Sequence, residues 1–129
     1  MTNLLWVAAG GAIGAVLRYI VSVKLTPEGA MEFPYATLTV NLIGCLVIGV
    51  MWSLTSQKTV SDGLLLFLMV GLIGSFTTFS TYGLDGIQLI QSGKLIAGVG
   101  YVLLSNIAGL LLIVFGKTIT DRFYIILGG

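Results

Sequence analysis

Histidine is absent from this chain of 129 residues, and cysteine occurs once, at Cys45. Without histidine and with a single thiol, the chain lacks the residues for the usual metal clusters and nucleophile–base pairs of enzymes. One cysteine also excludes a disulfide within the chain. We therefore predict that the protein is not an enzyme and that Cys45, which lies in an apolar run, is a small packing residue.

Charged residues are scarce as well. They make up 9% of the chain, whereas soluble domains carry roughly 25%. The net charge of +1 gives no basic or acidic patch that would indicate a nucleic-acid partner. Hydrophobic residues make up 57% of the chain and the mean hydropathy is +1.07. These values predict an integral membrane protein with lipid as its surroundings.

The long apolar runs define an all-α fold with one membrane domain, residues 1–129. A helix that crosses a bilayer needs about 20 apolar residues, and four segments meet this length: residues 4–23, 35–55, 63–84 and 95–116. The first run is too long for the apolar region of a signal peptide, so we interpret it as a retained helix. Polar residues predict three connections and a tail: Lys24–Pro34, Gln57–Asp62, Asp85–Lys94 and Lys117–Arg122.

The positive charges give no preferred orientation. Three lie on each predicted side of the membrane: Lys58, Lys117 and Arg122 on one, and Arg18, Lys24 and Lys94 on the other. Loop charge normally sets orientation, so a balanced chain is free to insert both ways and to pair as an inverted, dual-topology dimer. In so short a chain, an equal number of positive charges on the two sides can also arise by chance. Four helices pack around side chains, so a solute path would form between subunits.

A hydroxyl-rich stretch lies in the third span, at residues 74–82. Five of its nine residues are Ser or Thr, and aromatic residues recur at every third position, as Phe76, Phe79 and Tyr82. An intact polar helix is one interpretation, because hydroxyls bond back to helix carbonyls. A helix broken in mid-membrane is the other, since the Thr77–Thr78 pair propagates a helix poorly. Glycine pairs in three spans predict close helix contacts: Gly10/Gly14, Gly71/Gly74 and Gly98/Gly100.

Neutral polar groups also occur in the other spans. Asn41 lies in an apolar run with Thr37 one turn earlier, and Tyr101 and Ser105 are one turn apart in the fourth span. We predict that no acidic residue lies within a span, which argues against a proton-driven pump. Arg18, near the end of its span, either reaches the interface or attracts anions towards an entrance. Neutral donors suit passive conduction, because bound ions must be able to leave.

Three motifs together resemble the Fluc family of fluoride channels. They are Gly-x-x-Thr-Thr-Phe-Ser-Thr at 74–81, Thr-Leu-Thr-Val-Asn-Leu at 37–42 and Gly-x-x-Leu-Arg at 14–18. The resemblance covers all four spans. It implies an antiparallel homodimer in a prokaryotic plasma membrane, with two fluoride pores, a partner copy in inverted orientation and a central structural sodium ion.

The resemblance also assigns roles to individual residues. It implies that main-chain carbonyls of Gly74 and Thr77 hold the sodium ion and that Arg18 lies at the entrance. The implied pore residues are Asn41, Phe79, Ser80, Thr81, Tyr82, Tyr101 and Ser105. The chain departs from the family pattern at three positions: Tyr82 stands where Phe is often found, Ser75 where Gly is common, and Gly109 where a hydroxyl sometimes occurs.

Two other functions fit a chain of four apolar helices. The first is a small dual-topology transporter of drugs or cations, but the first span lacks the glutamate that such proteins carry in the membrane. The second is a membrane assembly subunit that transports nothing, for which a hydroxyl-rich break would have no use.

Overall fold

The computed structural model describes residues 1–26 and 33–127, and every regular element in these ranges is helical. Four helical segments are long and apolar enough to cross a membrane: Thr2–Leu25, Tyr35–Ser56, Asp62–Gln91 and Leu95–Ile126. They confirm the all-α, four-span fold predicted from sequence. Most of the predicted connection Lys24–Pro34, residues 27–32, lies outside the described residues.

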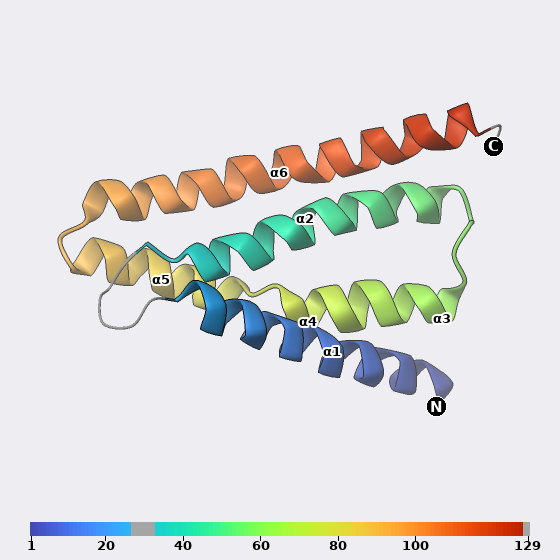
Figure 1. Cartoon of the computed structure of the whole chain (residues 1–129), viewed down its shortest axis with the longest axis horizontal. Helices are drawn as coiled ribbons and strands as arrows, with labels where there is room; N and C mark the ends of the chain where they lie inside the picture. The colour runs from blue at the N-terminus through green and yellow to red at the C-terminus, as the bar shows by residue number, and fades with distance from the viewer. Residues whose placement is uncertain (27–32, 128–129) are drawn as a thin grey trace.

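The helices run alternately up and down the long axis of the molecule (Figure 1). Helix α1 (Thr2–Leu25) packs against the first half of the third span, and α2 (Tyr35–Ser56) packs against α6 (Leu95–Ile126). Helix α1 begins and α6 ends at the same end of the molecule, where α2 also ends. Large apolar side chains of α1 and α6 remain exposed, including Val16 (58%), Leu110 (66%) and Leu111 (64%). These faces suit lipid or a second subunit rather than water.

The third span consists of four consecutive elements. It begins with one α-helical turn, α3 (Asp62–Leu65), and continues as the π-helix η1 (Leu66–Ile73). A short turn, α4 (Gly74–Phe76), follows, and α5 (Phe79–Gln91) completes the span after a gap at Thr77 and Thr78. A π-helix has wider turns than an α-helix, with bonds from residue i to i+5, and it often occurs near functional sites.

The third span extends seven residues beyond its predicted end at residue 84, because α5 continues to Gln91. The predicted connection Asp85–Lys94 therefore shortens to 92–94, and Asp85 lies inside the helix. Isolated polar residues do not stop a helix whose apolar residues continue. The stop comes at Gly93, which has a φ of +82°, and the amides of Gly93 and Lys94 bond to the carbonyls of Ile90 and Leu89.

Helix α6 is also longer than predicted. The sequence predicts an end at residue 116 and a polar tail over Lys117–Arg122, whereas α6 continues to Ile126. Lys117 and Asp121 are four residues apart and pair within the helix, with Nζ 2.6 Å from Oδ2. Such i,i+4 pairs support a helix. At 1.5 Å per residue, α6 is about 48 Å long and exceeds the roughly 30 Å hydrocarbon core of a bilayer.

The predicted glycine contacts are partly correct. A Cβ on Gly10 would overlap the carbonyl oxygen of Phe67, one on Gly14 would overlap that of Leu72, and one on Gly71 would approach that of Val7 at 2.7 Å. These glycines let α1 lie directly on η1. Gly98 faces Ile90, with 2.6 Å from an added Cβ to Cγ1, whereas Gly74 has only ordinary contacts and Gly100 has none within 4 Å. The Gly71/Gly74 and Gly98/Gly100 predictions are thus each right at one position and wrong at the other.

These contacts predict opposite effects of two matched substitutions. Gly10→Ala should destabilise the protein by about 1–3 kcal/mol, because backbone atoms of η1 must move away. Gly100→Ala should be neutral or stabilise by up to about 1 kcal/mol through helix propensity. Thermal unfolding in detergent, followed by loss of the monodisperse peak on size exclusion, measures both. Equal midpoints for the two variants would contradict the close α1–η1 contact.

Candidate functional site

The interruption of the third span is formed by two extended residues. Thr77 has ψ 161°, and Thr78 has φ −151° and ψ 121°. The interruption falls within the hydroxyl-rich segment that the sequence singles out. The Thr77 hydroxyl bonds back to the carbonyl of Ile73 at 2.9 Å and closes α4. The Thr78 hydroxyl accepts from the amide of Thr81 at 3.3 Å and caps α5. Both threonines favour caps over helix interiors, so the local sequence ends one helix and starts the next.

Asn41 of α2 holds the interruption through two hydrogen bonds. Its Nδ2 donates to the carbonyl of Thr78 at 3.1 Å, and the amide of Thr78 donates to its Oδ1 at 2.9 Å. The side-chain amide thus replaces a backbone partner for an extended residue. Each end of the amide has further capacity, one N–H and one lone pair, so Asn41 can hold the backbone and still offer a donor.

Two carbonyls of the interruption lose their usual helical partners. In an α-helix, the carbonyls of Gly74 and Thr77 would accept from the amides of Thr78 and Thr81. Here Thr78 donates to Asn41, and Thr81 donates to the Thr78 hydroxyl. The two carbonyls left without these partners are those that the family resemblance assigns to sodium.

Arg18 of α1 reaches the same region. Its Nε donates to the carbonyl of Ser75 at 3.0 Å, a carbonyl that would bond to Phe79 in an unbroken helix. A cation at the C-terminal end of α4 is favourable because that end carries partial negative charge. Arg18 therefore supports the end of α4. This contact differs from the predicted alternative in which the side chain only reaches the membrane interface.

A groove of about 290 Å³ lies over the interruption and brings together three of the predicted site residues, Asn41, Thr77 and Phe79. The other residues that line the groove are Gly44, Cys45 and Ile48 on the α2 side and Ile73 and Thr78 on the side of the third span. Cys45 accordingly lines a groove and also packs against α6, where an added Cβ on Gly109 would lie 3.1 Å from its Sγ. The Phe79 side chain is 85% exposed beside this groove.

Aromatic rings connect the groove to the α5–α6 face. The ring centroids of Phe79 and Tyr82 are 5.6 Å apart, and those of Tyr82 and Tyr101 are 5.5 Å apart. Phe33 packs edge-on against Tyr101 at 5.6 Å. Phe76 does not belong to this row, because the interruption turns it into the core, where it is 8% exposed. The three aromatic residues singled out in the sequence therefore lie in two different places: Phe76 packs in the core, and Phe79 and Tyr82 belong to the row of rings.

Three oxygen atoms of α5 and α6 are buried without a clear hydrogen-bond partner in the described part of the chain. They are Tyr101 Oη, Ser105 Oγ and Asp85 Oδ2. Thr37, Asp85 and Tyr82 are polar neighbours of the fully buried Tyr101. Unpaired buried oxygens are uncommon in proteins, so this face has unused capacity for a polar guest or water.

The structure corrects the prediction that no acidic residue lies within a span. Asp85 is part of α5, inside the apolar segment Asp62–Gln91, and Asp121 is part of α6, inside the apolar segment Leu95–Ile126. The sequence treats Asp85 as the start of a connection, although its spacing of three and four residues from Tyr82 and Thr81 places it on the same helix face. That spacing was the signal available for it.

The remaining predicted residues are less closely grouped. Ser80 and Gly74 are exposed on the surface of the chain. Thr81 accepts a hydrogen bond from the Thr78 hydroxyl at 3.0 Å, so it lies at the interruption. Ser105 lies on the α6 side with Tyr101. The predicted residues of one chain thus fall into two groups. Asn41, Thr77 and Phe79 lie at the groove, Tyr101 and Ser105 lie on α6, and the ring of Tyr82 connects the two groups.

Comparison with known proteins gives consistent matches over most of the chain. The family model described as "CrcB-like protein, Camphor Resistance (CrcB)" matches residues 5–117. A protein of Salinibacter ruber named "Fluoride-specific ion channel FluC" is 44% identical over 116 residues, which cover 90% of this chain and 87% of that protein. Proteins of the same name are 43% identical in Helicobacter acinonychis and 42% identical in Helicobacter pylori strain G27. Each of these matches covers 92% of this chain, with 95% and 93% of the relative.

The two-point contact of Asn41 predicts a large loss of stability on its removal. Asn41→Leu keeps the approximate size but leaves the amide and carbonyl of Thr78 unpaired, so we expect a loss of about 2–4 kcal/mol. Asn106→Leu is the matched control, because Asn106 is exposed and, among the described residues, bonds to the Tyr82 hydroxyl and to its own helix. Its change should stay below about 1 kcal/mol. Thermal unfolding in detergent compares them, and similar midpoints would show that the interruption does not depend on Asn41.

Proposed function

Because this chain belongs to the CrcB-like family, whose curated relatives include the fluoride channels described above, we propose that it is a fluoride-selective passive ion channel. It is not an enzyme, and its four apolar helices and bacterial relatives make it a multi-pass protein of a prokaryotic plasma membrane. The observation that carries the proposal is the interrupted third span, in which the start of α5 lies beside the groove at Asn41.

The proposed site offers the donors that a small anion needs. Fluoride is strongly hydrated, so a pore must replace the hydrogen bonds of water. The first amides of α5 have no intrahelical acceptors, and the N-terminal end of a helix carries partial positive charge. The hydroxyls of Ser80 and Thr81 and the remaining N–H of Asn41 add neutral donors, and the rings of Phe79 and Tyr82 offer partly positive edges.

Passive conduction is favoured by the weakness of these contacts. Several neutral donors in series bind an ion loosely enough for it to leave. The corrected place of Asp85 removes the sequence argument that no span carries an acidic residue, so the passive mechanism rests on the family and on the neutral donors around the interruption. A positive Arg18 close to the end of α4 attracts anions towards this region.

An inverted homodimer would complete the site. The groove at the interruption is open on one chain, and a partner would cover most of Phe79, which is 85% exposed despite its contact with Tyr82. Because the chain has balanced positive charge, two oppositely inserted copies can pair across this face. Each copy would then contribute Asn41 and Phe79 to one of two equivalent pores between the subunits.

A structural sodium ion fits the residues present at the interruption. The carbonyls of Gly74 and Thr77 lack their helical partners, and main-chain oxygens are suitable ligands for a hard cation. Two copies would supply four such carbonyls. When bound, the ion would contribute a fixed positive charge between the subunits.

The central prediction is rapid fluoride release. Liposomes that contain the purified protein and are loaded with fluoride should release it down its gradient, while chloride stays inside. Valinomycin lets potassium leave at the same time and balances the charge, and a fluoride electrode follows the release. A dual-topology drug or cation transporter would move its own cargo without fluoride, and an assembly subunit would move neither. Liposomes that retain fluoride with folded protein present would overturn the proposed function.

A pair of tyrosines tests which hydroxyls contact the ion. Tyr101→Phe removes a buried hydroxyl beside Thr37 and keeps the ring, so the fold should change little while fluoride flux falls about fivefold or more if that hydroxyl serves the ion. Tyr82→Phe removes a hydroxyl that accepts from Asn106 and keeps the ring, so flux should stay near the wild-type value. Equal flux for the two variants would remove Tyr101 from the path.

Asn41→Asp tests the anion path directly. A carboxylate would repel fluoride and would also lose the Nδ2 donor to Thr78, so we expect flux to fall below detection. Asn106→Asp provides the matched control on the exposed face of α6. Undiminished flux in Asn41→Asp liposomes would place the path elsewhere.

A further inference from the structure

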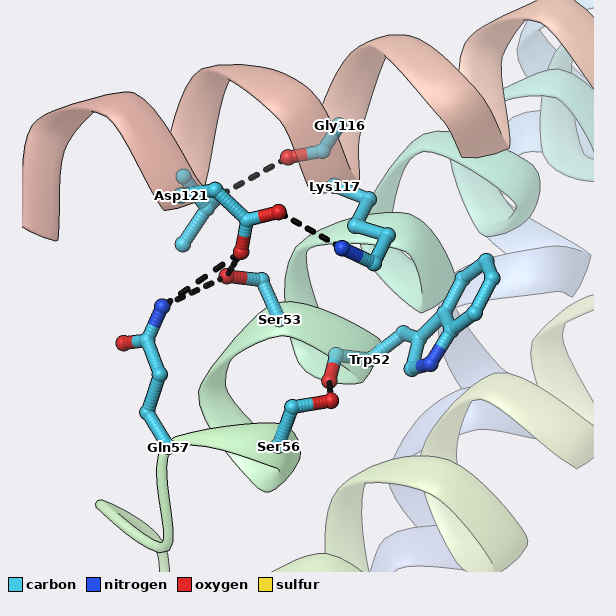
Figure 2. Close-up of polar contacts among 8 residues, drawn as sticks. Trp52, Ser53, Ser56, Gln57, Gly116, Lys117 and Asp121 are labelled. Carbon is cyan, nitrogen blue, oxygen red and sulfur yellow. Dashed lines mark hydrogen bonds and ion pairs between the residues drawn. The ribbon is translucent and has the colours of Figure 1, made fainter.

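A polar cluster joins the ends of α2 and α6, far from the interruption. Ser53, which is fully buried, donates through Oγ to Asp121 Oδ1 at 2.5 Å. Gln57, at the end of α2, donates through Nε2 to Ser53 Oγ at 3.0 Å and to Asp121 Oδ1 at 3.4 Å. Figure 2 shows the Asp121 carboxylate between these two side chains and Lys117.

The other carboxylate oxygen of Asp121 is paired within its own helix. Lys117 Nζ lies 2.6 Å from Oδ2 and 5.3 Å from the centre of the Trp52 ring on α2 (Figure 2). Oδ1 of Asp121 thus accepts hydrogen bonds from the end of α2, and Oδ2 pairs with a lysine of α6. A buried hydroxyl bonded to a carboxylate has a strict geometry, so the cluster fixes where these helix ends meet.

The middle of the α2–α6 contact consists of close glycine packing. Gly49 lies directly on the carbonyl of Ile113, and an added Cβ on Gly116 would lie 2.5 Å from that of Leu46. These contacts themselves favour the present register, because a shifted helix would bring a side chain against one of these carbonyls. The bonds of Asp121 hold the helix ends in the same register.

The relative position of α2 and α6 matters for the proposed channel. Helix α2 carries Asn41, about 18 Å along the helix from Ser53, and α6 carries Ser105, about 24 Å from Asp121. Since a helix transmits an axial shift along its length, the cluster at one end sets how the polar residues of the two helices oppose each other near the site.

The cluster lies beyond the region that the family model covers. That model ends at residue 117, four residues before Asp121, on the part of α6 that also extends past its predicted end. The bonds from Asp121 to α2 therefore lie outside the residues that the family model matches.

We propose that Asp121 is a positioning residue whose hydrogen bonds to Ser53 and Gln57 lock the register of α6 against α2 and thereby align the polar residues of the proposed fluoride path. This inference rests on the proposed function for its effect on flux. The register itself is measurable without flux, so the two can fail separately.

The single cysteine provides a direct measure of register. An added Cβ on Gly109 of α6 would lie 3.1 Å from Cys45 Sγ of α2, close to the roughly 3 Å between Cβ and the partner sulfur that disulfide geometry requires. Gly109→Cys should therefore cross-link to Cys45 on mild oxidation. A maleimide polymer tags the thiols that remain free at each time, and the loss of tagging gives the rate of cross-linking. The chain that retains Gly109 has Cys45 alone and controls for disulfides between chains.

Three variants separate the bonds of the cluster. In the Gly109→Cys background, Asp121→Leu should slow cross-linking about fivefold, because all bonds to α2 are lost. Asp121→Asn keeps an oxygen acceptor for Ser53 and Gln57 and should restore a rate near that of the parent. Lys117→Gln removes the pair within α6 and the contact with the Trp52 ring but leaves the hydrogen bonds of Asp121 to α2, so it should also cross-link at the parent rate.

Fluoride flux is measured in the same variants with Gly109 retained. Asp121→Leu should reduce flux several-fold while the protein stays monodisperse, and Asp121→Asn and Lys117→Gln should conduct like the wild type. Unchanged cross-linking in Asp121→Leu overturns the register lock, whatever the flux. Slow cross-linking with full flux overturns its role in conduction, and absence of flux in the wild type with slow cross-linking in Asp121→Leu would reject the proposed function alone.

Discussion

The paired hydrogen bonds between the Asn41 side chain and the backbone of Thr78 are the interaction on which the site depends. An extended residue inside a membrane helix exposes an amide and a carbonyl that lipid cannot satisfy. A single asparagine on the neighbouring helix supplies both a donor and an acceptor. Once Thr78 is held in this way, α5 can begin again at Phe79 beside the groove, while the carbonyls of Gly74 and Thr77 lose their helical partners.

The fold could be predicted from the sequence because lipid imposes a simple rule. Each span needs about 20 apolar residues in helical form, and four such runs are evident without further information. The ends of the spans were less accurate. Asp85 and Lys117 look like the edges of connections by composition, yet they lie within helices, because a helix ends where a cap such as Gly93 stops it. Polarity alone marks no helix end.

The candidate site was predictable as a set of residue types but not as a geometry. The hydroxyl run at residues 74–82 and the amide of Asn41 stand out in apolar spans, and both lie at the interruption. Their mutual bonds depend on which helices are neighbours, which one sequence does not reveal. Arg18 was assigned to an entrance, whereas its contact with Ser75 required the crossing of α1 over α4. Asp121 was overlooked because its partners Ser53 and Gln57 are more than 60 residues away in sequence.

The π-helical turns of η1 have a consequence for how this chain tolerates deletions. A π-helix accommodates a residue more per turn than an α-helix, so removal of one residue from Leu66–Ile73 leaves enough length for an ordinary α-helix. The span would stay continuous and apolar, and because a π turn holds its extra residue within a similar rotation, the later residues would keep roughly their present orientation. Thr78 would then still face Asn41. Length variation among homologous chains should therefore be tolerated in this short segment better than in a regular α-helix, where one deletion turns every later residue by about 100°.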